Sequence, residues 1–116
     1  MPLRFPKSSR LSRAAEFLRV KNEGESFHGK FIVLSVLKTN ESETRIGLIT
    51  SRRVGNAVKR NKVRRRMREI VRVARPQLKM GLWLVLIARW NATGATFRSL
   101  EQEWLRLASR ASILAE

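Results

Sequence analysis

Residues 55–74 read GNAVKRNKVRRRMREIVRVA, and this stretch decides what the rest of the fold must provide. Apolar residues recur in it at i, i+4, i+7, i+8 and i+11, which is the spacing of one stripe along an α-helix: Val63, Met67, Ile70, Val71 and Ala74. Gly55 suits a positive φ, Asn56 suits a helix N-cap, and Pro76 predicts the end of the helix. We therefore expect a long helix whose apolar stripe packs on another element.

The same region is strongly basic. Residues 52–68 carry nine Lys or Arg in seventeen positions and no acid. Like charges at i,i+4, as at Arg60 and Arg64, repel each other unless phosphates neutralise them. At about 100° per residue, five polar residues cluster opposite the apolar stripe: Asn61, Arg64, Arg65, Arg68 and Arg72. The helix N-terminus offers free N–H groups beside Arg52 and Arg53, so the pattern favours a phosphate-binding face over a merely solvated one.

The flanking sequence predicts further elements by its periodicity and its turn residues. These are a helix from Ser12 to about Lys21, a loop over 22–29, strands over 30–38 and 44–51, a buried strand over 81–89, and a helix from Phe97 capped by Thr96. The strands over 30–38 and 44–51 are predicted to form an antiparallel hairpin. With room for a further short strand, the order α-β-β-(β)-α-β-α predicts an α+β fold, a small two-layer sandwich with helices packed on a central sheet.

Composition points to a single RNA-binding domain over residues 1–116, with residues 1–10 as an extended basic arm. The chain has 25 Lys+Arg against 9 acidic residues, a net charge of +16, which a polyanion would neutralise. An anionic membrane surface is the weaker alternative, because the apolar stripe is needed for a core and the apolar run over 82–88 is too short to span a bilayer. The absence of cysteine fits a reducing environment, so we expect a cytoplasmic protein without a membrane partner.

The inventory of catalytic side chains is poor. The chain has no Asp and no Cys, its acids are all Glu, and His28 is its single histidine, predicted to lie in an exposed loop. A nuclease using two metal ions needs several carboxylates converging on them. We therefore predict no catalytic residues and no metal site in the protein, no bound cofactor and no small-molecule substrate. The chemistry should belong to a partner.

The string from Gly55 to Arg68 resembles the GNAV-x-RN-x-x-(K/R)-R-x-x-R signature of the bacterial ribonuclease P protein subunit. The flanks resemble the family as well, over about residues 10–110: Arg10, Leu11 and Phe17, then Arg45-Ile46-Gly47-Leu48, then Leu86-Ile87-Ala88-Arg89. The resemblance implies an α/β sandwich with a left-handed crossover that contains the basic helix. It also implies a catalytic RNA partner that positions Mg²⁺ ions and removes the 5′ leader of precursor tRNA.

The resemblance also implies two binding regions in this chain. The RNA-binding residues it implies are Arg52, Arg53, Asn56, Lys59, Arg60, Asn61, Lys62, Arg64, Arg65 and Arg68. A cleft between the first helix and the sheet would hold the single-stranded leader, lined by Phe17, Lys21, Lys30 and Leu34. Phe17 alone suits a core position as well as a cleft.

Two positions depart from the family pattern. The family's Arg-Asn-Arg reads Arg60-Asn61-Lys62 here, which keeps the charge but loses one guanidinium. Family clefts often carry aromatic residues at the positions aligned with Lys21 and Leu34, so apolar packing and phosphate pairing are expected to replace some stacking. The alternative function is that of a structural RNA-binding protein of ribosomal type, which shares the charge but not the motif.

Overall fold

The basic stretch forms the predicted helix. The computed structural model describes residues 9–115, in which α2 spans Ala57–Ala74. The side chain of Asn56 accepts a hydrogen bond from the Lys59 N–H at 3.0 Å, and Gly55 has φ +143°, so both predicted roles at the helix start are confirmed. All the residues of the predicted apolar stripe are buried: Val63, Met67, Ile70, Val71 and Ala74.

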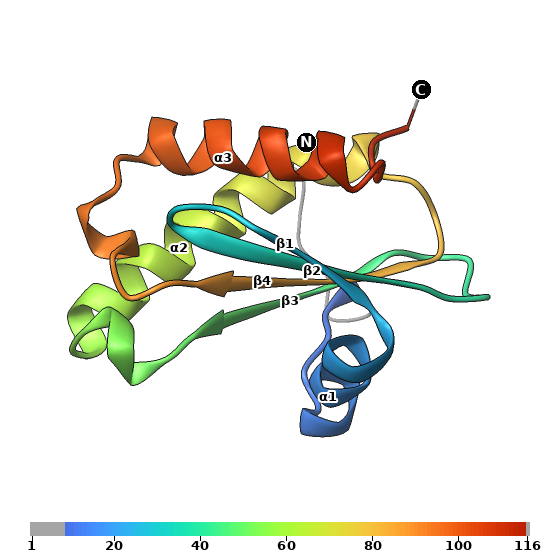
Figure 1. Cartoon of the computed structure of the whole chain (residues 1–116), viewed down its shortest axis with the longest axis horizontal. Coiled ribbons are helices and arrows are strands. Elements are labelled where there is room, and N and C mark those ends of the chain that lie inside the picture. Colours follow the sequence, from blue (N-terminus) through green and yellow to red (C-terminus); the bar gives the residue numbers. More distant parts are fainter. Residues whose placement is uncertain (1–8, 116) are drawn as a thin grey trace.

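A four-stranded sheet provides the surface on which α2 packs (Figure 1). The strands are β1 (Glu25–His28), β2 (Ile32–Lys38), β3 (Arg45–Thr50) and β4 (Leu82–Ala88), in the spatial order β1-β2-β4-β3. β1 pairs with β2 and β2 with β4 in antiparallel fashion, whereas β3 runs parallel to β4. Helix α2 is therefore the crossover between two parallel neighbours.

The strand order corrects the predicted hairpin between the strands over 30–38 and 44–51. β4 lies between them, because a strand that is apolar at nearly every position is buried on both faces and takes a central place. The predicted loop over 22–29 is also wrong in part, since it contains β1. The exposed, polar β1 has no apolar periodicity and is held by its pairing with β2, from Glu25↔Val36 to His28↔Val33.

Helices cover both faces of the sheet (Figure 1). α2 and α3 (Phe97–Arg110) lie on one face, and α1 (Ala14–Glu23) lies on the other. The main core is between the sheet and the two longer helices, around Trp104 and Met67. A smaller cluster on the α1 side is formed by Leu11, Val20, Leu37, Trp83 and Val85. The predicted α+β class is confirmed, with α1 as a partial third layer.

The start of α1 differs in detail from the prediction, whereas the start of α3 agrees with it. α1 begins at Ala14 rather than after Ser12, because the Glu16 carboxylate accepts the N–H groups of both Ser12 and Arg13 at 3.0 Å. Thr96 caps α3 as predicted. Phe97 is 38% exposed, since the buried stripe of α3 starts one turn later at Leu100.

The predicted arm over residues 1–10 lies largely outside the described residues. Of its two described members, Ser9 is buried and Arg10 forms a parallel β-bridge with Ile46 of β3. Within residues 9–115, no helix is both long enough and apolar enough to cross a membrane.

Candidate nucleic-acid interface

The predicted RNA-binding residues gather on the solvent side of α2 and on the turn before it. We call this surface the basic face. Of its ten residues, Arg60 is half-buried and the other nine are exposed: Arg52, Arg53, Asn56, Lys59, Asn61, Lys62, Arg64, Arg65 and Arg68. Because the buried stripe faces the sheet, the cations stand where a large polyanion can reach them without disturbing the core.

Two arginines of α2 also hold the helix in place. Arg64 donates to the Thr50 hydroxyl of β3 at 2.9 and 3.2 Å, and Arg66 donates to the Ala95 carbonyl at 2.6 Å. A pocket of about 110 Å³ beside Arg64 is lined both by Arg68 of α2 and by Arg10 at the edge of β3. A further cation at the edge of the sheet therefore lies beside the basic face.

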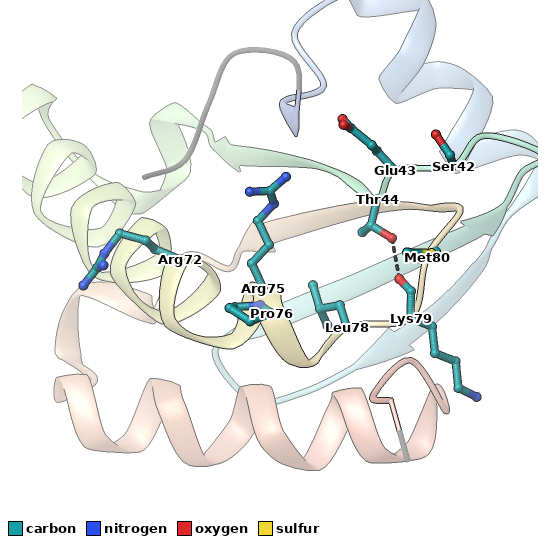
Figure 2. Close-up of a pocket in the computed structure, with 9 residues that line it drawn as sticks. All are labelled: Ser42, Glu43, Thr44, Arg72, Arg75, Pro76, Leu78, Lys79 and Met80. Carbon is teal, nitrogen blue, oxygen red and sulfur yellow. Dashed lines mark hydrogen bonds between the residues drawn. The ribbon is translucent and has the colours of Figure 1, made fainter. Parts of the chain in front are cut away.

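The C-terminal end of α2 has a different character. Arg72 donates to Glu69 at 2.6 and 3.0 Å, and this hydrogen bond holds the pKa of Glu69 below its usual value. A pocket of about 280 Å³ lies beyond, between this end of α2 and the turn after β2, and Arg75 reaches from it to the buried Ser9 hydroxyl. Figure 2 shows the Thr44 hydroxyl bonded to the Lys79 carbonyl at its rim. Because Arg72, Arg75 and Thr44 are bonded to other groups of the protein, we interpret this pocket as a structural contact between elements and not as a binding site.

The opposite face of the sheet carries a cleft of about 590 Å³ against α1, which we call the α1 cleft. It is lined from five elements: by Ala14, Phe17, Leu18, Val20 and Lys21 of α1, Ser26 and His28 of β1, Val33 and Ser35 of β2, Ile49 of β3, and Val85 and Ile87 of β4. The floor is aliphatic, no carboxylate is among the lining residues, and Lys21 stands on the helix side.

The position of α1 over the sheet is set by stacked and paired charges. The guanidinium groups of Arg19 and Arg45 both lie over the Trp83 ring, at 5.0 and 5.2 Å from its centroid. Arg45 also pairs with Glu16 at 2.6 Å. Burial raises the pKa of Glu16, but hydrogen bonds from the backbone of Arg13 and Ser12 and the contact with Arg45 outweigh it and hold that pKa below its usual value.

Gly47 allows α1 to approach β3 closely. A Cβ on Gly47 would lie 2.4 Å from the Phe17 ring, so the ring rests where only glycine leaves room. Phe17 consequently packs against the smaller cluster and also lines the α1 cleft, which combines the two roles that its sequence position allowed.

Two of the four predicted cleft residues lie elsewhere. Phe17 and Lys21 line the α1 cleft. Leu34 is fully buried in the main core, so its predicted place in the cleft is wrong: side chains alternate along β2, and a shift of one residue moves a side chain to the other face. Lys30 lies on the turn between β1 and β2, with its ammonium 5.2 Å from the Phe31 ring centroid, and is not among the lining residues.

The cleft also contains residues that sequence reasoning missed. Val33 and Ser35 are the neighbours of Leu34 that face α1, and Ser26 and His28 belong to β1, which lies where a loop was predicted. In the sequence, the only signal for Val33 and Ser35 was the alternation of side chains along β2, which places these two residues on the face opposite Leu34. Among residues 9–115, no three side chains of His, Cys, Asp or Glu gather closely enough to hold a metal ion.

Comparison with known proteins shows the family. The family model described as Ribonuclease P matches residues 5–112. The chain belongs to the ribonuclease P protein family. The ribonuclease P protein component of Natranaerobius thermophilus is 35% identical over 104 residues, covering 90% of both chains. That of Clostridioides difficile is 33% identical over 110 residues, covering 94% of this chain and 96% of the relative.

Solved structures of the ribonuclease P family have the same fold. The Staphylococcus aureus ribonuclease P protein superposes with a TM-score of 0.86 at 26% identity, over 93% of this chain and 99% of that one. The Thermotoga maritima protein gives a TM-score of 0.78 at 28% identity, over 87% and 96%. This chain is thus the protein component of ribonuclease P, an endoribonuclease, and its partner in the holoenzyme is RNA. The ribosomal alternative receives no support from these matches.

Proposed function

We propose that the basic face binds the catalytic RNA of ribonuclease P and that the α1 cleft binds the single-stranded 5′ leader of precursor tRNA. The two surfaces lie on opposite faces of the sheet, because α2 packs on one face and α1 on the other. One RNA can therefore occupy the basic face while a second strand enters the cleft.

The composition of the α1 cleft is the observation that carries the leader assignment. Its floor is formed by Val33, Ile49, Val85 and Ile87, with the Phe17 ring on the helix side. Such a floor suits unpaired bases, whose faces are free to pack on it, whereas a duplex hides those faces within its stack. Lys21 offers a cation for the phosphates that link the bases.

The basic face suits a folded RNA for a different reason. Its cations stand on a helix without an aromatic side chain, and the Asn56-capped N-terminus adds the positive end of the helix dipole. Such a surface recognises phosphates and groove shape rather than bases. In this proposal the RNA holds the Mg²⁺ ions and hydrolyses the phosphodiester, while the protein binds and orients the RNA strands and neutralises their phosphates.

The test of the proposal is the ratio of precursor to mature tRNA affinity in a holoenzyme reconstituted with a bacterial ribonuclease P RNA. Phe17→Ala with Lys21→Ala should lower that ratio by about fivefold or more, because stacking on one aromatic ring contributes about 1–3 kcal/mol per base. Affinity for the catalytic RNA should change little.

A matched control removes a cation outside the cleft. Lys38 is exposed at the end of β2, and Lys38→Ala should leave the ratio unchanged. Circular dichroism must show that α1 remains folded in the double variant, since Phe17 also packs on Gly47. A folded double variant that kept the wild-type ratio would exclude the α1 cleft as the leader site.

A further inference from the structure

The sheet side of the α1 cleft contains one planar side chain that no part of the motif includes. Among the lining residues, Phe17 is the ring on the helix side and His28 is the ring on the sheet side. His28 is exposed at the end of β1, and its backbone pairs with Val33 of the cleft floor. An exposed ring beside an aliphatic floor is available to a ligand in the cleft.

The neighbours of His28 form a polar strip along the same edge. Ser26 lies two residues earlier on β1 and therefore on the same face, and its hydroxyl meets that of Ser35 at 2.8 Å. A positive charge lies near the end of the strip, because the Arg89 side chain donates to the carbonyl of Gly29, the residue after His28, at 3.0 Å. The strip thus offers a base a ring, the hydroxyl of the exposed Ser26 and a nearby positive charge.

The backbone next to His28 is firmly anchored from the other side of the sheet. The Glu103 carboxylate of α3, 1% exposed, accepts the N–H groups of Lys30, Phe31 and Ile32 at 2.5, 2.8 and 2.8 Å. The Gly29 N–H donates to the Ile32 carbonyl at 2.8 Å, which closes the turn. Binding at His28 would therefore require little further ordering of the backbone, which favours affinity.

We propose that His28 is a leader-binding residue, whose imidazole ring stacks on one base of the single-stranded leader across the α1 cleft from Phe17. This inference rests on the proposed function of the cleft and goes beyond it by naming a contact on β1. Histidine is among the side chains on which unpaired bases stack, and its ring N–H can also donate to a base edge or a phosphate. One leader nucleotide lies against the β1 edge, with its neighbours over the aliphatic floor.

Three substitutions separate the properties of the imidazole. His28→Ala removes both ring and hydrogen bonding, His28→Phe keeps a ring, and His28→Gln keeps a polar group without a ring. In the reconstituted holoenzyme, His28→Ala should lower the precursor-to-mature affinity ratio by about fivefold or more. His28→Phe should restore it to within about twofold, and His28→Gln should not. Restoration by Gln but not by Phe would overturn stacking.

The matched control is Glu25→Gln, which changes an exposed residue of the same strand that is not among the cleft-lining residues. It should leave the ratio at the wild-type value. All variants alter exposed side chains, and thermal unfolding should show unchanged stability.

A second measurement locates the nucleotide. Precursor tRNAs with a single abasic position in the leader are bound to wild-type and His28→Ala holoenzymes. One position should weaken wild-type binding by about fivefold or more and weaken His28→Ala binding much less, because the two changes remove the same contact. Strictly additive effects at every leader position would overturn the contact.

The outcomes also separate this inference from the proposed function. If the Phe17 and Lys21 double variant lowers the ratio and His28→Ala does not, the cleft holds the leader without His28 and the inference fails alone. If neither lowers it, the cleft assignment fails as well. Equal losses for precursor and mature tRNA with His28→Ala would place the contact outside the leader and overturn the inference.

Discussion

The basic face and the α1 cleft are built in opposite ways. The basic face belongs to one helix and the turn before it, and seven of its nine exposed side chains are cationic. The cleft draws its lining from five elements, with an aliphatic floor and one lysine. Charge on a single helix suits the phosphates of a large folded RNA, whereas an apolar hollow suits bases that are not paired. The difference indicates a division of labour between holding the enzyme's RNA and holding its substrate.

The strongest expected effect concerns catalysis, which neither region should perform alone. The purified protein, freed of RNA, should not cleave precursor tRNA, because its carboxylates do not converge on a metal site within residues 9–115. Glu69→Ala should leave holoenzyme cleavage nearly unchanged, since Glu69 pairs with Arg72 at the protein surface. Specific cleavage by RNA-free protein at low Mg²⁺ would contradict the assignment of catalysis to the RNA.

The next effect concerns assembly at the basic face. Lys62, Arg65 and Arg68 are exposed, and replacing all three by Ala should weaken binding of the catalytic RNA by about 100-fold or more. The slope of log K against log salt should become shallower by about 0.7–0.9 per lost phosphate contact. The precursor-to-mature ratio of the holoenzyme that still assembles should stay at the wild-type value. A filter-binding salt titration measures the slope, and an unchanged slope would show that the basic face does not contact the catalytic RNA.

A smaller effect sharpens the boundary of the cleft. Leu34 belongs to the main core, so Leu34→Ala should destabilise the protein by about 2–5 kcal/mol without changing leader selectivity. Val33→Ala, on the cleft side of the same strand, should lower the selectivity at a smaller loss of stability, because Val33 is only partly buried. Denaturant unfolding and the tRNA affinity ratio measure the two effects. If a folded Leu34→Ala variant lost leader selectivity, the assignment of Leu34 to the core face of β2 and of Val33 to the cleft face would be wrong.

The smallest effect concerns the docking of α1 and depends on pH. The pKa of Glu16 is lower in the folded protein than its ordinary value near 4.5, so the carboxylate stabilises the fold above that value. This stabilisation is lost as the pH falls through the lowered pKa. Glu16→Gln should therefore be less stable than the wild type at pH 6, and the difference in stability between the two proteins should decrease towards pH 3. Thermal unfolding across this range tests the direction of the change, and a difference in stability that increased in acid would contradict it.

The sequence by itself determined helix α2 almost completely. Its cap, its buried stripe, its end before Pro76 and its exposed cations follow from contacts between residues at most a few positions apart. The poor inventory of catalytic groups was equally visible, because composition does not depend on folding. The family motif lies in this same helix, so recognition of the family used the locally determined part of the molecule.

The tertiary structure decided the strand order and the composition of the cleft. β4 separates β2 from β3, and the cleft residues on the sheet come from all four strands, so no local pattern contains them. The faces of β2 depend on a two-residue period, in which an error of one position exchanges Leu34 for Val33 or Ser35. Glu103 shows the same limit, because only packing reveals that a charged residue of α3 anchors the turn beside His28. Helix formation is local in the chain, whereas a cleft is a property of segments that meet only after folding.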